Sequence, residues 1–290
     1  MSTADNTLVE IYNPSTYPED IRILMSQYQD LLNRYEFDPQ SDLGDFDKWL
    51  HRDGIKAKGS KLRKQFEEAM GDCWLEGFHI TRTFQNKELV QKYYGDRGLL
   101  FPDNAFAKDY FDDMLAQIDC QREAVDFFVR GFYSVLFNDD NVFIRPRREL
   151  LSLFAAPSQY VLYESLGGYW NVYGQRLFGE ISKEIFRKIG HPVIDKIYKT
   201  LLDITCPYII RLRFRISDVT EKQSEYPKDF VISQLIGIMG SKYFRNASRR
   251  KVPINADNSV FCAQLDHEIV KDNILGIFSM DEWEEQSTNG

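Results

Sequence analysis

Glu76 and His79 are the pair of residues in this sequence whose types and spacing best suit chemistry. They stand in the run GDCWLEGFHITRTF, residues 71–84, beside the aromatic residues Trp74 and Phe78. If this run is helical, a carboxylate and an imidazole three positions apart lie on one face, where both can reach one metal ion or one proton path. The spacing therefore predicts part of a metal or acid–base site.

The fragment LEGFHI, residues 75–80, resembles over four positions a motif of helical non-haem iron enzymes. Ferritin-like and haem-oxygenase-like enzymes carry this Glu-x-x-His motif on a core helix, which implies iron as cofactor and further ligands from other helices. The available partners are Glu164, Glu180, His191 and Asp195, and the last two are spaced similarly to the late ligand helix of haem-oxygenase-like diiron oxidases. Tyr198 departs from that pattern, because another histidine usually stands there.

Aromatic residues make up 14% of the chain, which is enough to line a cavity for a partly apolar ligand. We expect an enzyme, an iron-dependent oxidase or oxygenase that acts on a small metabolite with dioxygen. Non-haem iron is favoured over haem, although His191 or His79 could serve as the axial ligand of a haem enzyme similar to the helical tryptophan-dioxygenase type. The candidate substrate-binding residues are Trp74, Phe78, Tyr163, Trp170, Arg211 and Arg213.

Two other functions are open. The first is a non-catalytic helical interaction module, in which the aromatic residues form the core and a groove for a partner. The second is a magnesium-dependent enzyme, because Asp112 and Asp113 resemble the aspartate-rich helix of class I terpene cyclases. The spacing of Asn258, Cys262 and Asp266 at four-residue steps is similar to the second metal motif of those enzymes.

The net charge of −8 and the pI near 5.2 disfavour binding to nucleic acid, which needs a basic face. The four cysteines are widely separated, so they form neither a CxxC metal site nor a dense disulfide framework. No run of about eighteen apolar residues is present, so we expect a cytoplasmic protein without a membrane span. A homodimer is compatible with the sequence.

The periodicity predicts a mainly α-helical fold, a compact bundle with a minor β element near residues 208–217. The resemblance of LEGFHI implies that this bundle is of the haem-oxygenase-like or a related kind. We expect an N-terminal arm over residues 1–17 and a single helical domain over 18–280, with a candidate subdivision near 138–149. The acidic tail covers residues 281–290.

Helices are expected from Pro18 to about Asp38, from Ser60 to Phe84, from Phe230 to Phe244 and from Val260 to Phe278. The strand is expected where Arg211, Arg213 and Arg215 alternate with apolar residues. Such arginines can grip a carboxylate or phosphate, or can simply form the solvated face of an edge strand.

Overall fold

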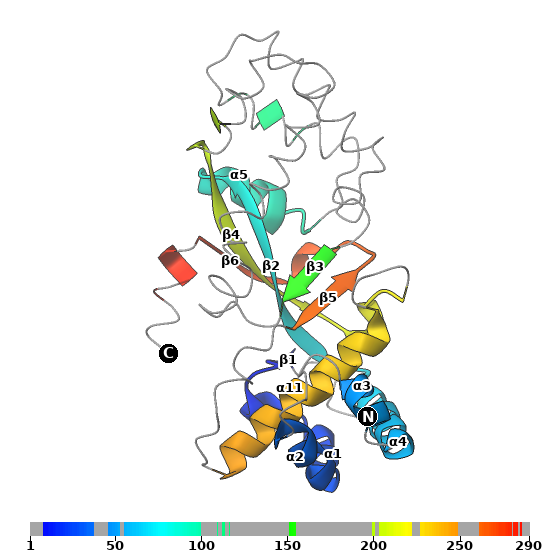
Figure 1. Cartoon of the computed structure of the whole chain (residues 1–290). Helices are drawn as coiled ribbons and strands as arrows, with labels where there is room; N and C mark the ends of the chain where they lie inside the picture. Colours follow the sequence, from blue (N-terminus) through cyan, green and yellow to red (C-terminus); the bar gives the residue numbers. More distant parts are fainter. Residues whose placement is uncertain are drawn as a thin grey trace. The chain divides into compact units, whose positions relative to one another are not determined.

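The structure is a computed structural model, and it describes about half of the chain. The described residues are 8–37, 46–52, 55–99, 109, 112–113, 116, 151–154, 199–200, 203–221, 227–248, 261–279, 281–283 and 285. Several residues of the predicted sites lie outside these ranges, namely Tyr163, Glu164, Trp170, Glu180, His191, Asp195 and Asn258. The fold is therefore described from the remaining elements (Figure 1).

A six-stranded sheet runs through the described chain. Its order is β5-β3-β2-β4-β6, and β1 pairs with β2 outside this path. The strands are β1 (Leu8–Val9), β2 (Trp74–Phe84), β3 (Leu151–Phe154), β4 (Thr205–Phe214), β5 (Cys262–Leu265) and β6 (Ile274–Ser279). β2 pairs in parallel with β1 and antiparallel with β3, where Phe78 faces Phe154.

The predicted compact, mainly α-helical bundle is wrong, because the fold is a mixture of helices and a six-stranded sheet. The error lies in residues 74–84, which form the central strand β2 and not the end of a helix. Gly71 and Asp72 form a turn that ends the preceding helix, and the following run is rich in aromatic and β-branched residues. Residues 260–278 are likewise not a helix, since they contain β5 and β6. β4 overlaps the strand expected near residues 208–217.

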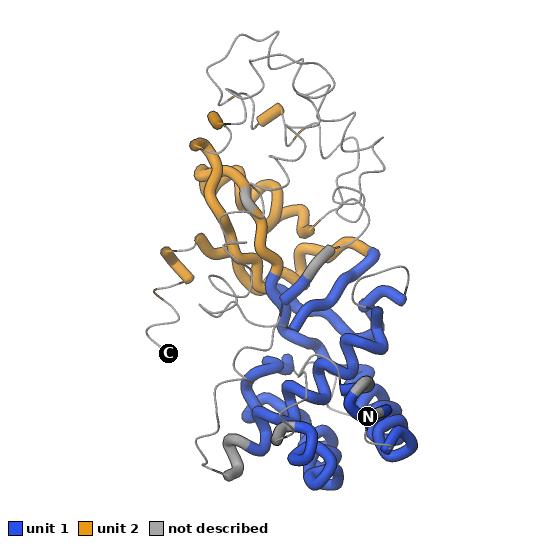
Figure 2. The backbone as a smooth tube through the Cα atoms, viewed as in Figure 1, with its two compact units in different colours: residues 1–78, 152–165, 212–266 blue, residues 79–151, 166–211, 267–290 orange. Residues whose placement is uncertain are grey.

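The chain divides into two compact units (Figure 2). Unit 1 comprises Met1–Phe78, Ser152–Ser165 and Leu212–Asp266, and unit 2 comprises His79–Leu151, Leu166–Arg211 and His267–Gly290.

The described helices of unit 1 gather around α11 (Lys228–Ser248). They are α1 (Glu19–Gln27), α2 (Gln29–Phe37), α3 (Phe46–Arg52) and α4 (Lys56–Met70). Every residue of α11 from 231 to 241 is buried, as expected for a helix that is apolar on most of its circumference. α11 contacts all four helices, and it also contacts β5. The burial of α11 therefore requires α1–α4 to pack around it.

Aromatic packing joins α2 to α3. The ring of Tyr35 meets those of Phe46 and Trp49 edge-on, with centroid distances of 4.9 and 5.2 Å. All three side chains are at most 3% exposed. Such edge-to-face pairs each add about 0.5–1.5 kcal/mol beyond the burial of area, so this cluster holds α3 beside α2.

In unit 2, the short helix α5 (Lys87–Val90) is capped by the side chain of Asn86, which accepts a hydrogen bond from the backbone of Glu88 at 2.9 Å. A π-helical turn, Gln91–Gly95, continues it. The next bend places Gly98 at a positive φ of 86°. There Leu99 forms an isolated antiparallel bridge with Ile269.

Replacing Gly98 by alanine should lower the free energy of unfolding by about 2 kcal/mol or more. The left-handed backbone costs an alanine about 1–2 kcal/mol, and its Cβ would also stand 2.1 Å from the carbonyl oxygen of Ile269. Urea unfolding of Gly98→Ala measures the loss. Gly71→Ala is the matched control, because its Cβ meets only ordinary contacts at 3.5 Å or more. Equal stability of the two variants would contradict the described bend.

Candidate functional site: a basic pocket on three helices

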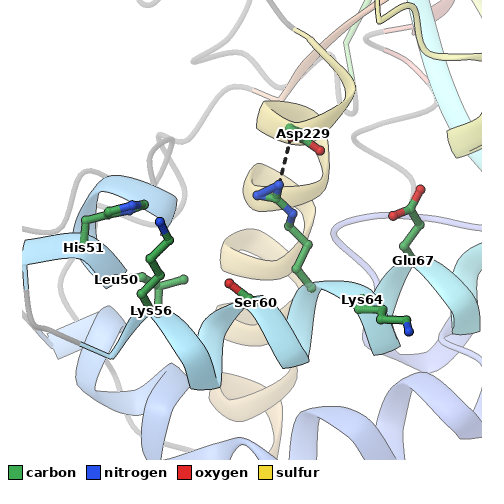
Figure 3. A pocket seen from close by; sticks show the side chains of 8 residues that line it. Leu50, His51, Lys56, Ser60, Lys64, Glu67 and Asp229 are labelled. Atoms are coloured by element: carbon green, nitrogen blue, oxygen red, sulfur yellow. Dashed lines mark ion pairs between the residues drawn. The ribbon is translucent and has the colours of Figure 1, made fainter.

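A pocket of about 450 Å³ in unit 1 is formed by α3, α4 and the start of α11 (Figure 3). Its lining residues are Leu50 and His51 of α3, Lys56, Ser60, Arg63, Lys64 and Glu67 of α4, and Asp229 of α11. The α4 residues recur at three- and four-residue steps, so they share one face of that helix. One amphipathic helix thus supplies most of the polar groups of the pocket.

Both carboxylates of the pocket are paired with cations. Asp229 lies 2.9 Å from the guanidinium of Arg63, shown by the dashed line in Figure 3. Glu67 lies 2.7 Å from the ammonium of Lys228, which neighbours the pocket. Since these acids are already neutralised, the positive charge of the pocket comes from the remaining lysines.

Lys56 and Lys64 are these remaining lysines. Lys56 is exposed at the first position of α4, and Figure 3 shows its side chain and that of His51 pointing toward one another. Lys64 contacts Glu68 at 3.8 Å, but both side chains are largely exposed, at 79% and 66%, so this pair contributes little. Ser60 lies between the two lysines at four-residue steps, which makes a Lys-Ser-Lys stripe along α4.

The start of α4 is electrostatically unfavourable in the absence of an anion. The N-terminal end of a helix carries a partial positive charge, which acidic residues normally offset. α4 has no acidic residue in its first turn and no side-chain cap, and cations occur at Lys56, Lys58 and Lys61. An anionic ligand in the pocket would relieve this repulsion.

The structure does not place Glu76 and His79 in one metal site, which corrects the expectation of a helical iron ligand pair. Both stand on β2, and residues separated by an odd number of positions point to opposite faces of a strand. Glu76 is buried at 7% exposure and His79 is half-buried. Within the part of the chain that the structure describes, no group of three or more His, Cys, Asp or Glu side chains could hold a metal ion. The metal-binding and oxidoreductase predictions are therefore not supported.

The structure brings Trp74 and Arg213, both predicted to bind substrate, into contact. The guanidinium carbon of Arg213 lies 4.6 Å from the centroid of the Trp74 ring. Phe78 is 3% exposed and belongs to the core, and Arg211 is half-exposed on β4. Tyr163 and Trp170, like Glu164, His191 and Asp195, lie outside the described residues.

The residues of the terpene-cyclase alternative are also placed differently from the expectation. Cys262 lies on a strand, and Asp266 follows that strand and accepts a hydrogen bond from the hydroxyl of Thr220 at 3.1 Å. Asn258 is outside the described residues. The four-residue spacing therefore does not put Cys262 and Asp266 on one helix face.

Asp113 of that alternative is engaged by protein partners in unit 2. Its carboxylate accepts hydrogen bonds from Lys92 Nζ at 2.5 Å and from Tyr93 Oη at 2.6 Å. These bonds, from Lys92 first and then Tyr93, hold the pKa of Asp113 below its ordinary value. Burial and the bond to Asp113 raise the pKa of Tyr93 to about 12, so its phenol remains a donor.

The basic pocket on α4 was not anticipated from the sequence. Its signal is present in the run KAKGSKLRK, residues 56–64, which carries several cations and no acidic residue in an acidic chain. If this run is read as an amphipathic helix, Lys56, Ser60 and Lys64 lie on one face. The contribution of Asp229 comes from far along the chain, so no local pattern could have indicated it.

No protein-family model, no curated protein and no solved structure matches this chain. Across the described residues, the helices are all too short or too polar to cross a membrane. The function proposed below therefore depends on the geometry of the pocket.

Replacing Asp113 by asparagine should lower the free energy of unfolding at pH 7 by about 0.5–1 kcal/mol, a small value because the side chain is one-third exposed. A depressed pKa in the folded state means that this contribution is present above pH 4 and is lost as the pH falls through the folded-state pKa. Urea unfolding of the wild-type protein and of Asp113→Asn measures the difference in their free energies of unfolding at pH 7 and near pH 3.

Asp112→Asn is the matched control for Asp113, because the neighbouring carboxylate is exposed. We expect it to change stability little at either pH. If Asp113→Asn loses the same free energy of unfolding at both pH values, the charge-assisted hydrogen bonds of Asp113 are contradicted.

Proposed function

We propose that this chain is a ligand-binding protein that holds a small phosphate-bearing molecule in the pocket of α3, α4 and α11. The observation that carries this proposal is the Lys56-Ser60-Lys64 stripe. Arg63 pairs with Asp229, and the pair of Lys64 with Glu68 is so exposed that it competes little with a ligand. Glu76 and His79 occupy opposite faces of β2 and so give no support to the iron-dependent oxidase, which stays a prediction.

A phosphate group suits the chemistry of this pocket. Lysine ammonium groups bind phosphate as point charges, and the hydroxyl of Ser60 can donate to a phosphate oxygen. The uncapped start of α4 adds backbone N–H groups and a partial positive charge. The volume of about 450 Å³ falls within the range of small-molecule sites.

The ion pairs would keep the pocket in shape. Arg63 joins α4 to Asp229, and Lys228 joins the start of α11 to Glu67. Both pairs bridge the same two helices without using Lys56 or Lys64, and the pair of the half-buried Lys228 contributes more than that of Asp229, which is 74% exposed. Lys56 and Lys64 can then turn toward a ligand at little conformational cost to the fold.

The other expectations about partners stay predictions. They are a small-molecule substrate, the absence of nucleic acid and membrane partners, and a homodimer. The non-catalytic interaction module, in which the aromatic residues form the core and a groove for a partner, stays a prediction as well.

Lys56→Ala and Lys64→Ala should each weaken binding of phosphate compounds by about three- to tenfold, because each removes one charge-assisted contact of about 1 kcal/mol. Isothermal titration calorimetry with inorganic phosphate, pyrophosphate and AMP measures the dissociation constants. Binding should also weaken as salt rises from low to physiological concentration.

Lys58→Ala and Lys61→Ala are matched controls, because these exposed lysines stand on the same helix but do not line the pocket. We expect their dissociation constants to stay within about twofold of the wild-type value. If all four variants lose affinity equally, the effect is one of net charge and the pocket is not the site. If no phosphate compound binds the wild-type protein, the proposal is wrong.

A further inference from the structure

A tryptophan and two arginines form a stacked cluster in unit 1, apart from the helical pocket. Trp74 begins β2, and Arg213 and Arg215 stand on or just after the neighbouring strand β4. The guanidinium carbons of Arg213 and Arg215 lie 4.6 and 4.4 Å from the centroid of the Trp74 ring. Both distances are within the range of a cation–π interaction.

The cluster lies on the solvent-facing side of β4. Leu212, Phe214 and Ile216 are buried, whereas the alternating Arg213 and Arg215 are half-buried. The buried side is firmly packed, since the ring of Phe214 stacks on that of Phe261 at 6.4 Å. The strand therefore holds the two arginine side chains half-buried on a firmly packed support, with the Nε atom of Arg215 buried.

Arg215 retains unused hydrogen-bonding capacity. Its Nε atom is buried, and the described residues offer it no hydrogen-bond partner. The nearby carboxylate of Asp218 accepts the backbone N–H of Arg215 at 2.7 Å. A buried donor without an acceptor costs free energy, so such a donor indicates a missing partner.

We propose that Trp74, Arg213 and Arg215 form an oxyanion-binding site for a carboxylate or phosphate group. Stacking on an aromatic ring fixes the plane of a guanidinium and leaves its N–H edge available. That edge matches two oxygens of one carboxylate or phosphate, and Nε is one of its donors. The ligand supplies the acceptor that Arg215 Nε lacks, and Arg213 adds a second positive charge.

This site does not depend on the function proposed for the α4 pocket, and the experiment keeps the two apart. The protein carrying both Lys56→Ala and Lys64→Ala is labelled with 5-fluorotryptophan, and the Trp74 resonance is assigned by Trp74→Phe. Fluorine NMR then follows titrations with sodium phosphate and sodium acetate against sodium chloride at equal ionic strength. We expect a saturable shift of the Trp74 resonance with phosphate or acetate and none with chloride.

Arg215→Lys keeps the charge but removes Nε and the planar fork, so it should weaken this binding by about tenfold. Arg211→Lys is the matched control, because Arg211 occupies the same alternation of β4 without stacking on Trp74, and its affinity should change less than about twofold. The other tryptophan resonances report whether each variant remains folded. If Arg215→Lys does not fold, Arg213→Lys replaces it, with the same expected loss.

A Trp74 resonance that responds to phosphate and acetate no more than to chloride would overturn the proposal. An unchanged affinity in the arginine-to-lysine variant would overturn it as well, because the stack would then only join the strands. A response of the same size in Arg211→Lys and Arg215→Lys would point to general charge and would also contradict the site.

Discussion

The pairing of β2 is the constraint on which the rest of the described structure depends. β2 lies between β3 and β4 and also pairs with β1, so its backbone is bonded along both edges. A side chain at Gly77 would stand 2.9 Å from the ring of Phe214, so the glycine allows β4 to pack closely. Once β2 is a strand, Glu76 and His79 are separated onto opposite faces, and Trp74 is brought beside the arginines of β4.

The helical pocket follows from the burial of α11. Because residues 231–241 are buried without interruption, α1–α4 must cover this helix and α4 must lie along it. The start of α11 then offers Lys228 and Asp229 to Glu67 and Arg63. The apolar core thus sets the position of α4, and the ion pairs set the charge that remains in the pocket.

Sequence patterns predicted the elements whose periodicity is unambiguous. The helices expected from Pro18 to about Asp38 and from Phe230 to Phe244 correspond to α1, α2 and α11, and the arginine alternation indicated β4. The helix expected over residues 74–84 was wrong, because a run so rich in aromatic and aliphatic residues satisfies both the helical and the strand period. The separation of Glu76 from His79 depends on pairing with β3 and β4, which are distant in sequence. The pocket could not be predicted either, because Asp229 joins it from far along the chain. The contact of the arginines with Trp74 could not be predicted because it depends on the register between β2 and β4.

The most direct test of this account is the set of backbone Cα and Cβ chemical shifts of residues 74–84 in the intact protein. A strand predicts Cα shifts below and Cβ shifts above their random-coil values along the whole segment, with slow amide exchange because both edges are paired. Helical deviations of the opposite sign would contradict the account. They would return Glu76 and His79 to one face and remove the basis for the stack of Trp74 on the arginines.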